Sequence, residues 1–294
     1  MPGRRLRETL VKFTDITPYI GAELTGATYQ DLERPEVFDE LVRNVHERQL
    51  VVVRSIELTA KQQIALASRL GRPVPFVISK YRHPEFPEIM ISSNEVRNDK
   101  PIGVARVGNF WHQDSTFVAD PAPFTMLHGV NVPGTSGHTL FASAVDVYDR
   151  LPEEWKRKLA DRTGIHTVAK RLRIRPEHVG LSAAEFKAQA ETEHPPVRHP
   201  LVRHDEVTGR PYLYGSREYM EGVAGFDANE TEEFFTLVDG LIQDPEHVYT
   251  HRWTTNDLLV WKTRTTYHAA TDVEPGVNRT VHRVSIESGE QWAA

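Results

Sequence analysis

The stretch FTMLHGVNVPGTSGHTLFASA (124–144) holds two runs of β-forming residues, separated by the turn-forming residues PGTSG (133–137). Similar short runs lie on both sides of it, and a polar stretch with helical character occupies about 150–195. Short strands at both ends of a helical insert predict an α+β fold, an antiparallel β-sandwich or jelly roll with helices packed outside. The other runs are EIMISSN (88–94), FWHQDSTF (110–117), RPYLYG (210–215), VYTHRW (248–253), DLLVWKT (257–263) and RTVHRVSIES (279–288).

Two helices and a buried strand are predicted nearer the N-terminus. EVFDELVRNVHERQ (36–49) has apolar residues at helical spacing, and LVVVR (50–54) is typical of a buried strand. TAKQQIALASRLG (59–71) predicts a second helix that begins after Thr59 as N-cap and ends at Gly71.

The composition excludes several classes of site. A formal charge of −6 argues against a nucleic-acid-binding surface. The absence of cysteine excludes disulfides, thiolate zinc sites, iron–sulfur clusters and cysteine nucleophiles, so any metal must be held by histidine and carboxylate. We see no secretion signal, and the longest aliphatic run, LVVV (50–53), is too short for a membrane span. We expect a cytoplasmic protein with residues 1–294 in a single domain, since no Pro/Gly/Ser-rich linker divides the chain.

The tripeptide His112-Gln113-Asp114 lies within the run 110–117. On a strand, residues i and i+2 point to the same face, so His112 and Asp114 would project together. An imidazole with a carboxylate suits Fe(II), Mn or Zn, and a second histidine would complete the facial triad of non-haem iron oxygenases. The alternative is an ordinary hydrogen-bonded pair of polar residues on a strand.

A second group of candidate residues lies in the segment 256–289. His268 follows a strand, and Arg279 and Arg283 stand four residues apart on a run with β character, which places both arginines on one face. Two inward guanidiniums are costly unless they meet anions, and arginine is suited to bidentate carboxylate recognition. Taken singly, His268 is more often a satisfied polar residue near a loop, and each arginine is more often a solvated surface charge.

With these residues in place, the chain resembles the taurine/2,4-D dioxygenase (TauD/TfdA-like) family of Fe(II)/2-oxoglutarate-dependent oxygenases. The resemblance covers nearly the whole chain, in seven ordered blocks. In addition to FWHQDSTF, the matching blocks are ITPYIGAELTGA (16–27), LVVVRSIELTAKQQIALASRLG (50–71), HPEFPEIMISSN (83–94), VPGTSGHTLFASAVDVYDRLP (132–152), HPLVRHDEVTGRPYLY (199–214) and DLLVWKTRTTYHAATD (257–272).

The resemblance implies a double-stranded β-helix with iron at its mouth. It implies His112, Asp114 and His268 as the Fe(II) ligands, with the three remaining metal positions taken by 2-oxoglutarate and O₂. Thr139 matches a threonine that hydrogen-bonds 2-oxoglutarate, and Arg279 matches the arginine that pairs with its distal carboxylate. Asp114 also argues against the halogenating variant of the family, in which a small residue replaces the carboxylate.

Two segments depart from the family pattern. TSGHT (135–139) carries His138 where aspartate is usual, which affects the turn and makes His138 a possible decoy ligand. WKTR (261–264) replaces the frequent Trp-Asp-Asn-Arg, so Lys262 alters local hydrogen bonding without touching the ligand set.

The substrate side is less defined, and we expect hydroxylation of a small anionic substrate. Arg283 matches an arginine that often reaches the substrate's acidic group, and Tyr81 and Arg173 are further candidates, with loop packing and surface charge as the alternatives. Some segments are most similar to isonitrile-forming oxygenases of lipopeptide biosynthesis, which oxidise an N-carboxymethyl β-amino acid. Ser115 and Arg173 differ from the tyrosine and lysine of those enzymes.

Two rival interpretations come from other classes. A zinc hydrolase could use the same three ligands, but no HExxH motif is present and Arg279 and Thr139 would have no purpose there. The other interpretation is a jelly-roll binding protein that has lost its metal. The intact triad counts against it. Homo-oligomer formation is possible, and nothing in the sequence demonstrates it.

Overall fold

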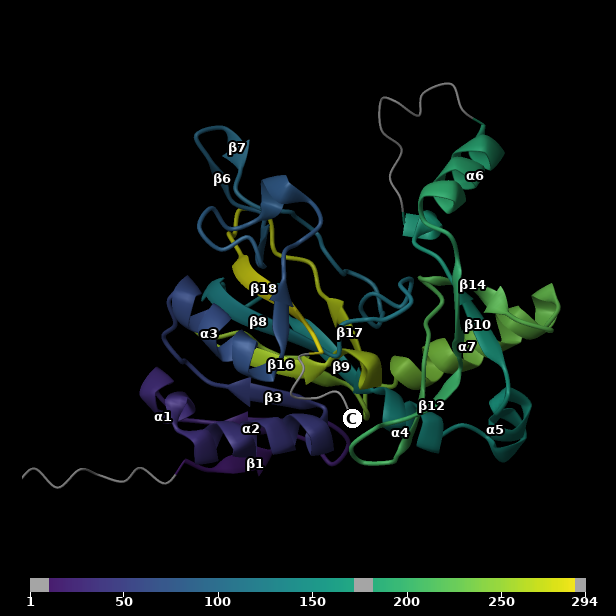
Figure 1. Ribbon diagram of the computed structural model, residues 1–294, viewed down its shortest axis with the longest axis horizontal. Helices are drawn as coiled ribbons and strands as arrows, with labels where there is room; N and C mark the ends of the chain where they lie inside the picture. The colour runs from purple at the N-terminus through teal and green to yellow at the C-terminus, as the bar shows by residue number, and fades with distance from the viewer. Residues whose placement is uncertain (1–10, 172–181, 289–294) are drawn as a thin grey trace, which may run out of the picture.

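A large mixed sheet forms the centre of the molecule, whose computed structural model describes residues 11–171 and 182–288 (Figure 1). The strand order is β1-β2-β3-β16-β8-β18-β4, and β5 also pairs with β18. Neighbouring strands are antiparallel except β2 and β3, which are parallel. The strands are β1 (Phe13–Asp15), β2 (Ala22–Leu24), β3 (Leu50–Val53), β4 (Arg72–Val74), β5 (Ile89–Ser93), β8 (Phe124–Asn131), β16 (Leu258–Lys262) and β18 (Thr280–Glu287).

A smaller antiparallel sheet faces this large one. Its order is β15-β9-β17, formed by β15 (Tyr249–His251), β9 (Thr139–Ser143) and β17 (Thr266–Ala270). Side chains from both sheets form one apolar core, in which Leu127 and Trp261 of the large sheet join Phe141 of β9. The candidate site lies at this junction because β17 carries His268.

The large sheet is buried on both faces. Leu50 and Val52 of β3 belong to the core shared with the small sheet, whereas Val51 and Val53 pack with the helices on the opposite face. This division follows from the two-residue period of a strand and explains why the sequence there is continuously apolar.

The N-terminal helices cover the outer face of the large sheet, as Figure 1 shows for α2 (Pro35–Arg48) and α3 (Ala60–Leu70), next to the short α1 (Tyr29–Glu33). The two longer helices confirm the predicted ones to within one residue at each end. Thr59 is the N-cap of α3 and forms a capping box with Gln62, and Gly71 follows its last residue.

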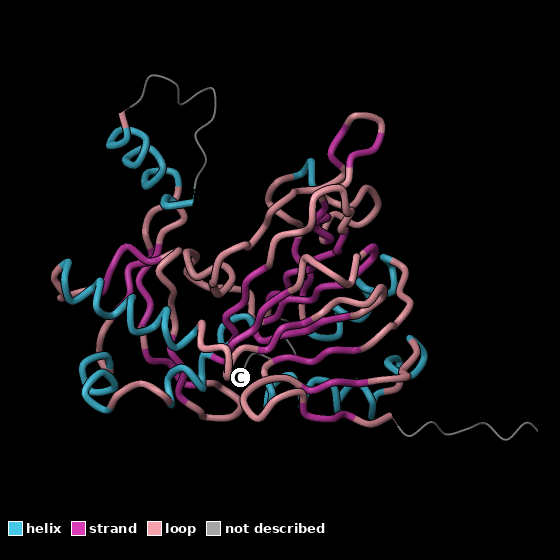
Figure 2. The backbone as a smooth tube through the Cα atoms, turned by 180° about the vertical axis from the view of Figure 1, so that it is seen from behind, coloured by secondary structure: helices cyan, strands magenta, loops and turns pink. Residues whose placement is uncertain are grey.

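A second group of elements lies at the other end of the molecule (Figures 1 and 2). It contains a sheet of order β11-β10-β14 and a β12–β13 hairpin, which pack with helices around an apolar cluster of their own. These elements are α4 (Ala144–Asp149), α5 (Glu153–Leu159), β10 (Thr163–His166), α6 (Ala183–Glu193), β11 (Val197–Pro200), β12 (Val202–His204), β13 (Pro211–Leu213), β14 (Met220–Val223) and α7 (Ala228–Ile242).

Short elements complete the described chain. A small hairpin, β6 (Val96–Arg97) with β7 (Lys100–Pro101), projects at the edge, and three 3₁₀ turns are η1 (Ser79–Tyr81), η2 (Ala169–Arg171) and η4 (Thr263–Thr265). None of the helices in the described ranges has the length and apolar character that a membrane span requires.

The runs on either side of the turn 133–137 form strands as predicted, β8 and β9, and these belong to different sheets. The structure differs from the sequence-based prediction in two places. The helical stretch at 150–195 also contains β10. The segment 110–117 is not a strand, because only His112 forms a bridge, to His268, and a turn follows in which Ser115 has φ +57°. Asp114 already lies in this turn, so the same-face argument for two residues of one strand does not apply to His112 and Asp114.

Candidate active site

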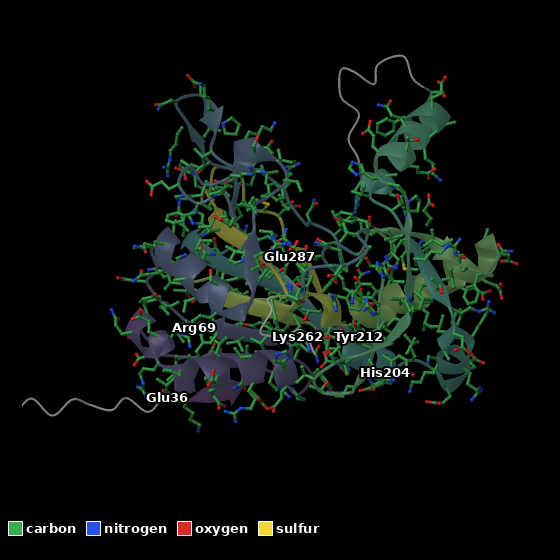
Figure 3. All side chains as sticks on the ribbon, in the orientation of Figure 1. Glu36, Arg69, His204, Tyr212, Lys262 and Glu287 are labelled. Atoms are coloured by element: carbon green, nitrogen blue, oxygen red, sulfur yellow. The ribbon has the colours of Figure 1, made fainter. Side chains whose placement is uncertain are left out.

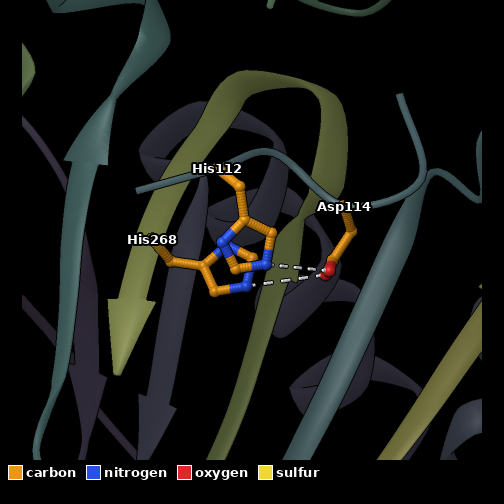
Figure 4. Close-up of side chains that lie close together, drawn as sticks. All are labelled: His112, Asp114 and His268. Atoms are coloured by element: carbon orange, nitrogen blue, oxygen red, sulfur yellow. Dashed lines mark ion pairs between the residues drawn. The ribbon is translucent and has the colours of Figure 1, made fainter. Parts of the chain in front are cut away.

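His112, Asp114 and His268 come together although the first two do not lie on a strand. His112 and His268 are joined by reciprocal backbone hydrogen bonds, with N–H···O distances between the two residues of 3.0 and 2.9 Å. The turn after His112 then brings Asp114 back towards both imidazoles (Figure 4). Gly108 leaves room for His112, because a Cβ at Gly108 would lie 2.9 Å from the ring.

The distances between the three side chains suit one metal ion. Nε2 of His112 lies 3.5 Å from Oδ1 of Asp114, and Nε2 of His268 lies 3.7 Å from Oδ2 of the same carboxylate (Figure 4). One ligand atom from each residue falls within 4.8 Å of the others, and all three residues are buried. Two ligand atoms that bind one ion at right angles, each about 2.1 Å from it, are ~3 Å apart. The three side chains therefore need to move only slightly closer together to bind one ion.

Both histidines present Nε2 to the Asp114 carboxylate. Nδ1–H of His112 donates to the carbonyl of Phe110 at 2.8 Å, since a carbonyl can only accept, and this leaves the Nε2 lone pair directed at the site. Burial and, to a lesser extent, the neighbouring His112 lower the pKa of His268 to about 3. An unprotonated imidazole is the form that binds a metal.

Asp114 is held as a carboxylate. Burial alone would raise the pKa of Asp114, but the pKa is held well below its usual range, chiefly by the Arg283 guanidinium. Nη2 of Arg283 lies 2.8 Å from Oδ2 of Asp114, and the Thr125 hydroxyl donates to the same oxygen at 3.3 Å. Oδ1 makes neither contact, which leaves it available on the side of His112.

The triad, Thr139, Arg279 and Arg283 line one cavity. A neighbouring cavity of about 300 Å³ shares Arg279 with it, together with Ser92, Val107 and Ala270. We call the cavity that contains the triad the inner cavity. Its remaining walls are mainly apolar, with Met90, Leu127, Trp261 and Val281. Three side chains with the spacing to bind one metal ion and two guanidiniums therefore line one cavity, which adjoins a larger one.

Arg279 has no anionic partner among the described residues. Nε of Arg279 donates to the Gly137 carbonyl at 2.8 Å, while the terminal nitrogens make no hydrogen bond and no ion pair within the described ranges. Burial lowers the pKa of Arg279 to about 10, which is still far above neutrality. Gly137 permits this approach, because it has φ +66° and a Cβ there would lie 2.6 Å from Cδ of Arg279.

Thr139 is oriented by a tryptophan. Nε1–H of Trp253 donates to the Thr139 hydroxyl oxygen at 3.1 Å, so the hydroxyl hydrogen is free to donate to a ligand in the cavity. The sequence interpretation missed Trp253, and no spacing rule could have found it, because the two residues are 114 positions apart. It also missed Tyr219, whose ring lies 5.9 Å from that of His112.

The other predicted residues lie outside the inner cavity or outside the described ranges. Tyr81 ends η1, and its described contact is Nζ of Lys80 above its ring at 4.8 Å. Arg173 falls within 172–181, outside the described residues, so its role and the isonitrile alternative that depends on it stay predictions. His138 is not part of the metal-sized group. Lys262 is buried in an ion pair with Asp205.

Two facing sheets with a two-histidine, one-carboxylate site and an adjacent basic pocket define the class of non-haem iron oxygenases. The chain belongs to the taurine catabolism dioxygenase TauD, TfdA family, whose model matches residues 12–285. This confirms the resemblance inferred from the sequence. The protein is an α-ketoglutarate (2-oxoglutarate)-dependent dioxygenase that uses Fe(II) and O₂, and the zinc hydrolase and metal-free interpretations are wrong.

Curated relatives agree with this assignment, and solved structures share the fold. The chain is 28% identical to pentalenolactone F synthase of Streptomyces arenae, over 92% of this chain and 94% of the relative. It is 27% identical to an α-ketoglutarate-dependent 2,4-dichlorophenoxyacetate dioxygenase of Cupriavidus pinatubonensis (strain JMP 134 / LMG 1197), over 84% and 87%. A taurine dioxygenase structure from Burkholderia xenovorans matches with a TM-score of 0.75 at 22% identity, over 94% and 89%.

A further structure contains metal and a small-molecule ligand. AAD-2 in complex with Mn(II) and N-oxalylglycine matches with a TM-score of 0.74 at 21% identity, over 95% of this chain and 98% of that one. At this identity the likeness establishes the fold alone.

Proposed function

We propose that this enzyme hydroxylates a C–H bond of a small anionic substrate while it converts 2-oxoglutarate to succinate and CO₂. One oxygen atom of O₂ goes to succinate and the other to the product. The observation that carries the proposal is the cavity that contains the triad and two guanidiniums, of which Arg279 has no carboxylate partner among the described residues. A half-buried cation without an anion is unfavourable, so a bound anion would stabilise it.

His112, Asp114 and His268 are proposed to hold Fe(II). When bound, the ferrous ion supplies the redox chemistry that couples decarboxylation to oxygen insertion. The protein's part is to keep the His268 imidazole neutral, to orient the His112 ring, to keep Asp114 ionised, and to surround the site with apolar walls that limit water.

Arg279 and Thr139 are proposed to bind 2-oxoglutarate. The free terminal nitrogens of Arg279 match the fork that receives a carboxylate, and the Thr139 hydroxyl has a hydrogen to donate beside it. The Gly137 carbonyl and the Trp253 indole hold these two groups in place before the cosubstrate arrives.

Arg283 is proposed to attract the anionic group of the substrate. Its guanidinium faces the cavity beside Asp114, and the adjoining cavity of about 300 Å³ has the size of a small-molecule site. The 2,4-dichlorophenoxyacetate dioxygenases among the relatives are named for a carboxylate substrate. Tyr81 and Arg173 remain candidates for the outer part of this site.

We also infer that the two facing sheets form the core of a double-stranded β-helix, and that residues 1–294 make one catalytic domain. Support comes from the family match over residues 12–285 and from the core shared by the two sheets. Cytoplasmic location, the absence of nucleic-acid binding and homo-oligomer formation stay predictions.

The test is substrate-dependent formation of succinate. Purified enzyme with Fe(II), 2-oxoglutarate and O₂ should form succinate in proportion to one member of a panel of small carboxylates, sulfonates and sulfates, with a product 16 Da heavier. Without O₂, Fe(II) and 2-oxoglutarate should give a weak visible absorption band. His268→Ala should abolish both signals, whereas His204→Ala, an exposed histidine of β12, should preserve them. Absence of the band from the unmodified enzyme would refute the proposed site.

A further inference from the structure

The residues adjacent to the metal-binding side chains meet at one backbone segment, Leu213–Gly215. Gln113 lies between His112 and Asp114 in the sequence, and it is fully buried. Tyr267 directly precedes His268 on β17, and it is also fully buried. Because neighbouring residues on a strand point to opposite faces, Tyr267 points away from the cavity into which His268 points.

Gln113 uses both ends of its amide. Its Nε2 donates to the Arg264 carbonyl at 2.6 Å and to the Leu213 carbonyl at 3.3 Å, and its Oε1 accepts from the Gly215 N–H at 2.7 Å. Arg264 lies in η4, which immediately precedes β17. Gln113 therefore connects the segment that carries two ligands to the segment that carries the third.

Tyr267 reaches the same place from the other side. Its hydroxyl lies 3.1 Å from the Leu213 carbonyl oxygen and 3.0 Å from the Gly215 carbonyl oxygen, so its one hydrogen is shared between them. The Leu213 carbonyl thus accepts from both Gln113 and Tyr267, using the two lone pairs of the oxygen.

The shared segment is itself fixed. Leu213 belongs to β13, which pairs with β12, and the N–H of Tyr214 donates to the Leu201 carbonyl at 2.7 Å. Gly215 has φ +130°, and a Cβ there would collide with the Met220 side chain. A segment with so little freedom can serve as a fixed support for two others.

We propose that Gln113 and Tyr267 are positioning residues for the metal centre, anchored on Leu213–Gly215. They fix the distance between the turn that presents His112 and Asp114 and the strand that presents His268. Neither touches the metal position, so their effect passes through the backbone of the ligand residues. The inference uses the proposed function only in taking the triad as the metal site.

The experiment compares metal affinity with folding stability. Mn(II) binding to the metal-free enzyme is measured by electron paramagnetic resonance, and melting temperature is measured on the same samples. Gln113→Met and Tyr267→Phe should each raise the Mn(II) dissociation constant about tenfold, the lower end of the loss known for residues that orient metal ligands. The double variant should lose less than the product of the two factors, because both side chains act through Leu213 and Gly215.

Matched controls remove an equivalent group elsewhere. Gln63 is a fully buried glutamine whose Nε2 donates to the His282 carbonyl at 3.1 Å on the helix-covered side of the sheet. Tyr249 carries a hydroxyl 3.1 Å from Nδ1 of His251, outside the triad. Gln63→Met and Tyr249→Phe should lower the melting temperature and leave the Mn(II) dissociation constant within twofold of the parent.

The outcomes separate this inference from the proposed function. If Gln113→Met and Tyr267→Phe lower the melting temperature but bind Mn(II) like the parent, the positioning role is wrong and the metal site stands. If Gln113→Met does not fold, Tyr267→Phe alone decides, because it removes a single hydroxyl. If the unmodified enzyme binds no Mn(II), the metal site fails, and with it both the proposed function and this inference.

Discussion

At the scale of single residues, the most specific prediction concerns the effect of Arg279 on the KM for 2-oxoglutarate. Its terminal nitrogens have no hydrogen-bond or ion-pair partner among the described residues, so their proposed partner is the 2-oxoglutarate carboxylate. Arg279→Gln should raise the KM for 2-oxoglutarate by a factor of about 10 to 100, since a hydrogen bond to a charged group contributes about 1.5–3 kcal/mol. Arg279→Lys should recover part of the loss, because the charge remains and the planar fork does not.

The control for Arg279 is Arg252, an exposed arginine that, like Arg279, lies near His138. Arg252→Gln should leave the KM for 2-oxoglutarate unchanged in the same steady-state assay. An unaltered KM in Arg279→Gln would instead mean that the cosubstrate carboxylate binds elsewhere.

At this scale the sequence predicted the residues that are proposed to hold the metal, but not the residues that contact and orient the site. His112, Asp114 and His268 were identified by motif and family resemblance, and the structure brings them together. Trp253 and Gln113 were not identified, because each acts through contacts more than 100 positions away along the chain. Such contacts have no local signature, whereas a ligand motif has one.

At the scale of elements, one buried ion pair joins two parts of the fold. Lys262 ends β16 in the large sheet, and its ammonium contacts the carboxylate of Asp205, in the loop between β12 and β13. Figure 3 labels Lys262 and Tyr212 where the large sheet meets the second group of elements. The sequence showed that Trp-Lys-Thr-Arg departs from the family pattern. It did not show that Lys262 pairs with Asp205, which lies 57 positions upstream.

Lys262→Met should therefore destabilise the fold. It leaves the Asp205 carboxylate buried without a cation, which costs about 3–5 kcal/mol. The double variant Lys262→Met/Asp205→Asn should recover most of this loss, because asparagine is uncharged and still accepts from the N–H groups of Val207 and Thr208. Urea denaturation measures both effects, and equal stability of the single and double variants would contradict the role of the pair.

Elements were predictable where the signal was local. The helices over 36–49 and 59–71 have apolar periodicity and recognisable ends, and both formed as expected. The run 110–117 has strand-like composition, yet the backbone turns at Ser115 with a positive φ. Composition cannot reveal such a turn, because it is set by the pairing of His112 with a strand far along the chain.

At the scale of the whole molecule, buried histidines should make the fold sensitive to acid. Burial, together with the nearby His199 and Arg203, lowers the pKa of His166 to about 3, and its ring nitrogens have no hydrogen-bond partner among the described residues. Burial also lowers the pKa of His282 to about 4. In the unfolded chain both take up a proton near pH 6.5. The unfolded state therefore binds more protons below that pH, and folding stability falls as pH falls towards 4.

The measurement is urea denaturation of metal-free enzyme between pH 7 and 5, so that metal binding does not contribute. His166→Leu should flatten the decline by up to about 1.4 kcal/mol per pH unit, because one titrating group is removed. The exposed His204→Asn should show the parent's slope. A parent whose stability does not change over this range would contradict the prediction.

The reciprocal backbone hydrogen bonds between residues 112 and 268 also bear on biosynthesis. A ribosome that has just made the first two ligands must add a further stretch of chain, comparable to the 151 positions that separate Gln113 from Arg264, before the third can pair with them. Long-range pairing of this kind is late in the folding of a large chain. A nascent chain therefore lacks a complete set of the three proposed metal ligands during most of its translation.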